Sequence, residues 1–189
     1  PDSVQGGLTN GNDNAAPAIS PDGSSLYYTS VEQSDLYVRT AKIFRAARAG
    51  EGGYAVGTEL KMWDDTLRMA AHPALSPDGK RMVFVSTGGY GGKDLYTIRT
   101  DQIGTLKPTN MGAAINSAGD EMYPSFYDDS TLYFASDGHP GLGGLDIFRA
   151  KLDTNGEWQV VNLGSPINSS FDDYGICFSP TPDREHVTE

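Results

Sequence analysis

An internal repeat with an interval of about 52 residues constrains the fold of this chain more than any other feature. The segment Pro17–Gly23 reads PAISPDG and the segment Pro73–Gly79 reads PALSPDG, so six of the seven positions are identical. A degenerate copy, YPSFYDD, begins at Tyr123. Because chance does not hold one spacing across several segments, the sequence predicts repeated copies of one structural unit.

Other segments keep the same interval. The motif Ile43–Ala46 returns as Leu95–Ile98 and as Ile147–Ala150, and Asn110–Ser117 returns as Asn162–Ser169. A further copy of the opening segment begins at Tyr174. We therefore expect a single domain over residues 1–189, divided into repeats of about 14–69, 70–120 and 121–172 and a partial copy over 173–189.

Each repeat contains the signals of four short strands. Its apolar runs are three to five residues long and rich in Tyr, Phe, Val and Ile, which favours strands. Ser-Pro-Asp-Gly suits a tight turn between the first two, because Pro presets φ and Gly accepts unusual backbone angles. A weaker fourth strand is expected around Thr105–Pro108 and Trp158–Asn162. The predicted structural turn residues are Asp22, Gly23, Asp78 and Gly79.

Four short strands in a repeat of about 50 residues are typical of a β-propeller blade. Such a sheet has two apolar faces, and radial stacking buries both. A β-sandwich is the alternative, but it does not require a register conserved at a fixed period. We expect an all-β propeller of four-stranded blades, with three full repeats and partial flanking blades. Either Val4–Thr9 closes the last blade or the chain is part of a larger ring, and we favour the ring.

Composition excludes several classes of function. The chain carries 25 Asp and Glu against 14 Lys and Arg, a formal net charge of -11, which disfavours binding to nucleic acid or anionic lipid. Cys177 is the only cysteine, so no internal disulfide can form. No apolar run approaches the roughly 18 residues of a membrane span. Because the chain begins with Pro1, we expect a processed or excised piece.

The sequence holds no recognisable catalytic motif. Its three histidines, His72, His139 and His186, fall in different repeats without metal-ligand spacing, and no Gly-x-Ser-x-Gly elbow is present. The acid pairs, such as Asp172-Asp173, lie in separate turn contexts that favour solvated loops over acid–base chemistry. We therefore predict a protein that is not an enzyme and that has no cofactor and no metal site.

Two aspartates and several loop residues are the remaining candidates. Asp94 and Asp146 each precede a third strand, where a carboxylate could hold Ca²⁺ but more simply accepts backbone N–H groups of the glycine-rich turn. Gly144 is expected to need a positive φ in that turn. Since one face of the ring should gather the loops, the candidate partner-binding residues are Tyr90, His139, Asn116 and Asn168.

Two segments carry a family resemblance. SDGHPGLGGLDIF over residues 136–148, and NLGSPINS over Asn162–Ser169 followed by DDYG, resemble the TolB-like propeller repeats of Bacteroidota OmpA-family proteins. The resemblance covers about Asn14 to Pro180. It implies a periplasmic, outer-membrane-associated propeller module, in a group that includes a type IX secretion component, with peptidoglycan bound by a separate domain. The first repeat departs from the pattern, since Thr29–Lys42 lacks the glycine-rich turn.

The resemblance and the lack of catalytic motifs together predict a non-catalytic scaffold. Its partners would be proteins of the cell envelope, in type IX secretion or in envelope anchoring. One alternative is the propeller domain of a prolyl-oligopeptidase-like hydrolase, which a downstream Gly-x-Ser-x-Gly would favour. The other is a glycan-binding propeller, although the arginines mostly flank strands instead of clustering.

Overall fold

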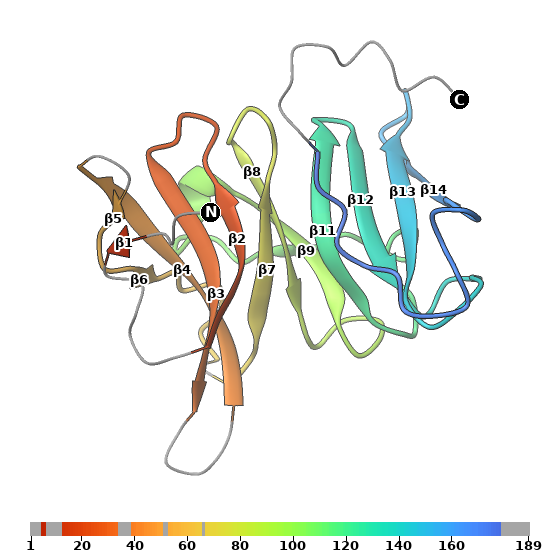
Figure 1. Ribbon diagram of the computed structural model, residues 1–189, viewed down its shortest axis with the longest axis horizontal. Helices are drawn as coiled ribbons and strands as arrows, with labels where there is room; N and C mark the ends of the chain where they lie inside the picture. The colour runs from red at the N-terminus through yellow and green to blue at the C-terminus, as the bar shows by residue number, and fades with distance from the viewer. Residues whose placement is uncertain (1–4, 7–12, 34–38, 51–52, 66, 179–189) are drawn as a thin grey trace.

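The computed structural model describes residues 5–6, 13–33, 39–50, 53–65 and 67–178. These residues form three sheets that stand side by side in chain order and are antiparallel except for one short parallel pair in the first (Figure 1). We call them blades 1, 2 and 3. Blade 1 contains β2 (Asp13–Ile19), β3 (Ser25–Gln33), β4 (Arg39–Ala49) and β6 (Thr58–Glu59). Blade 2 contains β7 (Ala70–Leu75), β8 (Arg81–Ser86), β9 (Asp94–Arg99) and β10 (Thr109–Asn110). Blade 3 contains β11 (Glu121–Asp128), β12 (Thr131–Ser136), β13 (Asp146–Leu152) and β14 (Trp158–Asn162).

Strand order confirms the predicted blade, because each chain segment pairs with the next in antiparallel fashion. The fourth strand of blade 2 lies at Thr109–Asn110, just after the expected Thr105–Pro108. The short 3₁₀ turn η1 (Thr100–Gln102) is the one helical element among the described residues. Within those residues, no helix is long and apolar enough to cross a bilayer.

The N-terminal strand does not close the last blade. β1 (Gln5–Gly6) pairs in parallel with β5 (Gly53–Tyr54), and β5 pairs in antiparallel fashion with β4. The strand β1 therefore belongs to the first sheet. The rest of the segment Val4–Thr9, and residues 179–189 of the partial fourth copy, lie outside the described residues. The pairing of Gln5 and Gly6 with the first sheet therefore shows that the expected closure of the last blade by Val4–Thr9 is wrong for these two residues.

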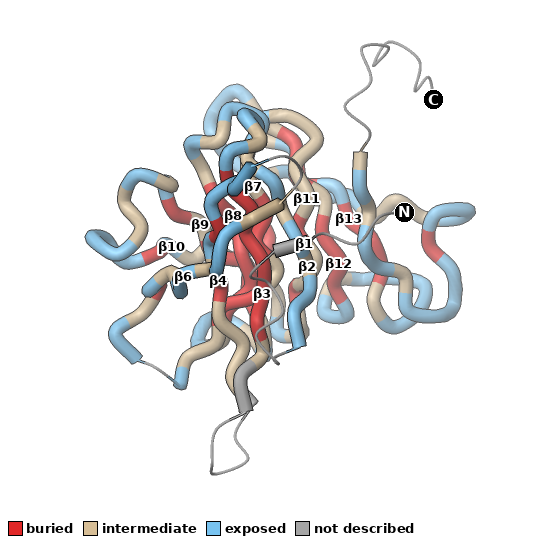
Figure 2. The backbone as a smooth tube through the Cα atoms, turned by 60° about the vertical axis from the view of Figure 1, so that its left-hand side comes forward, coloured by how far each residue is buried: buried red, intermediate tan, exposed pale blue. Residues whose placement is uncertain are grey.

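Side-chain alternation gives each blade two apolar faces. In β8, Met82 and Phe84 pack against residues of blade 1, whereas Val83 and Val85 pack against residues of blade 3. The buried stretches therefore run along the central strands (Figure 2). A sheet with apolar residues on both faces is stable in water only between two others, which accounts for the radial stack.

The Ser-Pro-Asp-Gly turns are held by their own aspartates. Asp22 accepts hydrogen bonds from the Ser20 hydroxyl and from the Ser24 N–H (3.0 Å), and Gly23 has φ of 69°. These bonds, the Ser20 hydroxyl first, lower the pKa of Asp22 to about 2. Asp78 and Gly79 repeat the arrangement in blade 2, so both turns join their strands in the same way.

The first strand of each blade lies at the edge of its sheet, next to the first strand of the neighbouring blade, and its backbone is irregular. β7 packs beside both β2 and β11. Each strand has a register shift, a proline that removes a backbone donor, and a residue in the left-handed region before that proline. Such irregular edges resist pairing with other strands. The left-handed residues are Ala16, His72 and Tyr123, and the prolines are Pro17, Pro73 and Pro124.

Three aromatic rings stack on one another, two from the first strands of blades 2 and 3 and one from the segment after blade 3. The His72 ring lies 4.3 Å from the Tyr123 ring, which lies 5.0 Å from the Tyr174 ring, measured between centroids. Burial, aided by the charge of Lys93, lowers the pKa of His72 to about 4. The imidazole is therefore neutral at pH 7, and its Nδ1 accepts the Tyr123 N–H at 3.4 Å.

Candidate functional site

A buried aspartate shapes the glycine-rich loop of blade 2, residues 87–93. Asp94 is fully buried and accepts hydrogen bonds from the Tyr90 N–H (2.6 Å), the Gly91 N–H (3.2 Å) and the Asn110 amide (3.3 Å). A Cβ at Gly89 would overlap the Asp94 carboxylate. The loop thus folds tightly over the carboxylate, and glycine at this position allows the close approach.

Blade 3 repeats this arrangement in residues 137–145. Asp146 is fully buried, its Oδ2 accepts the Leu142 N–H, and a Cβ at Gly141 would overlap the same oxygen. Its Oδ1 is buried without a hydrogen-bond partner among the described residues. Asp94 and Asp146 therefore act as loop-holding residues in both blades.

Asn116 lies inside blade 2, where it acts as an extra strand partner. Its Oδ1 accepts the Leu95 N–H at 2.8 Å, and its Nδ2 donates to the Leu95 carbonyl at 3.0 Å. The same Nδ2 donates to Asn110 Oδ1 at 2.8 Å, and that oxygen also accepts the Gly112 N–H. The amide group is therefore fully used within the blade.

Asn168 does the same in blade 3, bonding both backbone groups of Ile147 at 2.8 and 2.9 Å and Asn162 Oδ1 at 2.8 Å. Both Asn116 and Asn168 are buried. Because their polar atoms are inaccessible and already paired, the structure gives these two candidate partner-binding residues a structural role instead.

His139 also packs inward. Its Nε2 lies 2.7 Å from the Ile115 carbonyl oxygen of the preceding blade, and its ring packs against Phe134 and Phe148 at centroid distances of 6.0 and 5.2 Å. The half-buried ring therefore joins the loop of blade 3 to the segment that leaves blade 2. The ring therefore has a packing role, and its assignment to a contact surface stays a prediction.

The glycine loops are tied to the start of the next repeat. Lys93 forms an ion pair with Asp120, and the Glu121 N–H donates to the Lys93 carbonyl at 2.8 Å. In blade 3, the Leu145 N–H donates to Asp172 Oδ1 at 3.0 Å. Asp172 is exposed, as its acid pair had indicated, and its carboxylate also ties the glycine-rich loop of blade 3 to the segment that leaves this blade.

Gly144 is needed for close approach, not for a positive φ. Its φ lies outside the left-handed region, which corrects the sequence-based expectation. A Cβ at this position would overlap Asp172 Oδ1. The Asp172 carboxylate, in the segment that leaves blade 3, occupies the space that a side chain would take.

The glycine-rich loops and the segment after β14 expose three large apolar side chains, beside polar ones such as Asp137 and Asp172. Tyr90 is 58% exposed, Leu142 is 55% exposed, and Phe171 is 78% exposed. The loops that carry these side chains lie against neighbouring segments, since Gly91 and Gly138 both approach residues 117–119 and Gly143 approaches residues 169–171. We call this surface the loop rim and define it by Tyr90, Leu142 and Phe171. Sequence reasoning named only Tyr90, although Leu142 occupies the same repeat position 52 residues later.

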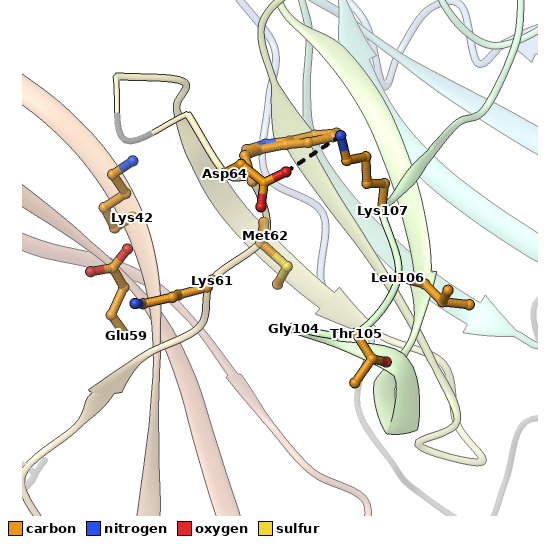
Figure 3. Close-up of a pocket in the computed structure, with 10 residues that line it drawn as sticks. Lys42, Glu59, Lys61, Met62, Asp64, Gly104, Thr105, Leu106 and Lys107 are labelled. Carbon is orange, nitrogen blue, oxygen red and sulfur yellow. Dashed lines mark ion pairs between the residues drawn. The ribbon is translucent and has the colours of Figure 1, made fainter.

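A separate cavity lies between the outer strands of blades 1 and 2 (Figure 3). Its volume is about 570 Å³, and its charged residues balance closely, with Lys107 paired to Asp64 at 3.4 Å. No pair of lining side chains forms a nucleophile with a base. We assign no chemistry to this cavity, whose charged lining residues are Lys42, Glu59, Lys61, Asp64 and Lys107.

No protein-family model matches the chain, and no curated protein matches it. Solved structures do. TolB from Acinetobacter baumannii gives a TM-score of 0.50 at 21% identity, covering 80% of this chain and 32% of TolB. A structure from a study of two prolyl endopeptidases gives 0.51 at 16% identity, covering 88% of this chain and 23% of that one. A thermostable family-43 glycoside hydrolase gives 0.54 at 18% identity, covering 83% and 56%.

At these identities the similarity shows the fold. The chain has a TolB-like β-propeller fold built from four-stranded blades, and the β-sandwich alternative is excluded. It spans between 23% and 56% of the length of these three neighbours. Because they include hydrolytic enzymes as well as TolB, the shared fold does not determine activity.

Proposed function

We propose that this chain is a non-catalytic propeller module that binds a protein partner through the loop rim. The observation that carries the proposal is that apolar side chains stand exposed on loops whose backbones are fixed by buried Asp94 and Asp146. Exposed apolar patches on a soluble domain mark interaction sites. Fixed loops lose little conformational entropy when they bind, so their contacts contribute more to affinity.

The use of the carboxylates supports a scaffold over an enzyme. Hydrolysis of a glycoside usually requires two carboxyl groups facing one substrate. At this end of the blades, Asp94, Asp146 and Glu121 are buried and hold backbone or hydroxyl groups of the protein. They are therefore poorly placed to act on a bound molecule.

The cellular setting is part of the proposal. The resemblance to TolB-like repeats of OmpA-family proteins, together with a TolB-like fold, supports a periplasmic module associated with the outer membrane. Its partners would be cell-envelope proteins in type IX secretion or in envelope anchoring. Any peptidoglycan contact would belong to a separate domain.

Site-specific photo-crosslinking in the native host tests the proposal. A benzophenone amino acid is placed at Tyr90 or Leu142, and the control position is Leu106, which is 57% exposed on the outer loop of blade 2. We expect the same protein to be captured from both rim positions and not from Leu106. Capture at Leu106 alone, or at no position while the variants melt normally, would contradict a rim-mediated interaction.

A further inference from the structure

Blades 2 and 3 each have an aspartate at the same position beside the glycine-rich loop. Asp120, in the segment that leaves blade 2, lies so close to Gly92 that a Cβ on the glycine would overlap its carboxylate. Asp172, in the segment that leaves blade 3, lies in the same way against Gly144. Both the aspartates and the glycines are separated by the repeat interval of 52 residues. The two carboxylates therefore occupy equivalent positions in their repeats.

The backbone that joins each loop to the following segment is also the same in the two repeats. The Glu121 N–H donates to the Lys93 carbonyl at 2.8 Å, and the Asp173 N–H donates to the Leu145 carbonyl at 2.6 Å. Lys93 and Leu145 are therefore equivalent residues of the two loops, and they too lie 52 residues apart. Their side chains differ, because blade 2 has a cation at this position and blade 3 has an apolar group.

This difference leaves the charge of Asp172 uncompensated. Lys93 forms an ion pair with Asp120, so the carboxylate of blade 2 is neutralised within the chain. Asp172 Oδ1 accepts the Leu145 N–H at 3.0 Å, but among the described residues Asp172 has no ion pair and its Oδ2 has no hydrogen-bond partner. Neither the loop 137–145 nor the segment 163–173 contains a lysine or an arginine. Blade 3 thus keeps the anion of the repeated ion pair without its cation.

The uncompensated carboxylate lies within the loop rim. Asp172 is exposed, directly follows the 78% exposed Phe171, and bonds to the loop that carries Leu142. Blade 2 shows how much of this position a following blade covers. There the next blade is in place, and the side chains of Asp120 and Lys93 are still 24% and 35% exposed. A partner that binds the rim can therefore reach Asp172.

We infer that the partner of the loop rim places a lysine or arginine on Asp172, as Lys93 lies on Asp120, and an apolar side chain beside Phe171. The inference rests on the proposed function and specifies the partner's chemistry. An ammonium or guanidinium group can form a charge-assisted hydrogen bond with the free Asp172 Oδ2. The formal net charge of -11 attracts a basic segment and repels an acidic one. The partner is therefore a protein segment in which a basic residue neighbours an apolar one.

Charge variants in the photo-crosslinking experiment test this inference. The crosslinker stays at Tyr90, and the yield of the captured partner is compared between variants that melt normally. Asp172→Asn removes the charge but keeps an oxygen for the Leu145 N–H, and Leu145→Lys supplies the cation that blade 3 lacks. Asp120→Asn is the matched control, because Lys93 already neutralises that carboxylate. We expect the yield to fall at least about fivefold for Asp172→Asn and for Leu145→Lys, and less than about twofold for Asp120→Asn.

Several results would overturn the inference and leave the proposed function intact. One is a yield that Asp172→Asn and Leu145→Lys do not change, and another is an equal fall for Asp120→Asn, which would indicate a general charge effect. A fall for Asp172→Asn alone would indicate a loosened loop, because Leu145→Lys leaves the carboxylate in place. Arg184 is the only lysine or arginine after Asp172, so a yield that rises with Arg184→Gln would identify a cation of this chain as the occupant. Absence of capture from the chain without these substitutions would instead refute the proposed function, and this inference with it.

Discussion

Replacing Asn116 by alanine should destabilise the protein substantially, although the residue lies outside the strands. The substitution removes the acceptor of the buried Leu95 N–H, whereas the Leu95 carbonyl keeps its bond from the Met111 N–H at 3.0 Å. One orphaned buried donor costs about 1–3 kcal/mol, and the lost amide bonds add about 1 kcal/mol. We therefore expect a loss of about 3 kcal/mol, or a Tm lower by about 6–12 °C for a domain of this size.

Urea unfolding followed by tryptophan fluorescence measures this loss. The matched control is Asn155→Ala, since Asn155 is exposed in the turn between β13 and β14 and its change should cost less than about 0.5 kcal/mol. Asn168→Ala should resemble Asn116→Ala, because its amide makes the same bonds to Ile147. If Asn116→Ala unfolds together with Asn155→Ala, the strand-partner role of this amide is refuted.

Three further outcomes are expected. Gly144→Ala and Gly144→Val should both lower stability, by about 1 kcal/mol, since either Cβ must move the exposed Asp172 carboxylate off the Leu145 N–H; thermal melting in which only the valine variant is affected would reject the close-approach explanation. The pKa of His72 is about 4 in the folded protein, against an ordinary 6.5, so the unfolded state binds a proton at higher pH than the folded state does. As the pH falls from 7 to 5, this difference should lower the free energy of unfolding by about 2 kcal/mol. His72→Asn, which tolerates the left-handed backbone, should lose that component in urea titrations at the two pH values, and an unchanged pH dependence would contradict it. Asp94→Asn should loosen residues 87–93, because the amide keeps one acceptor oxygen and turns its own donor toward either the Tyr90 or the Gly91 N–H group; limited proteolysis that finds no increase in cleavage within this loop would count against it.

The blade architecture was predictable because both the alternation of apolar residues within a strand and the interval between repeats are visible in the sequence. The alternation in Met82-Val83-Phe84-Val85 places side chains on two faces, and the repeated interval shows that each face meets a neighbour of the same kind. The turn at Asp78 was equally predictable from the sequence, since its geometry depends only on residues within the turn. Local chemistry and register are the properties that a single sequence records well.

The candidate surface was harder to predict, because exposure depends on what folds over a residue. Asn116 and His139 lie in loop segments, yet each is turned inward by contacts with Leu95 and Ile115 that no local pattern reveals. A signal for Leu142 was present, since it aligns with Tyr90 across the repeat interval. Phe171 had no such signal, because its counterpart in the preceding repeat is Gly119.

The glycine positions also differ in whether the sequence around them predicts their role. A positive φ at Gly79 follows from the turn motif alone, and the structure has φ of 70° there. At Gly144, the requirement comes from Asp172, which is 28 residues away in sequence, in the segment that leaves blade 3. A glycine that makes room for a distant group cannot be distinguished, from its own neighbours, from one that permits an unusual turn.

The most direct test of a rigid loop rim is amide hydrogen exchange at Tyr90 and Leu142. Both side chains are exposed, but both N–H groups donate to fully buried carboxylates. Their amides should exchange about as slowly as those of β8 and β12, and far more slowly than the amide of the exposed loop residue Lys107. Exchange at Tyr90 and Leu142 as fast as at Lys107 would show that the loops are not held by Asp94 and Asp146, and it would contradict the account of this surface.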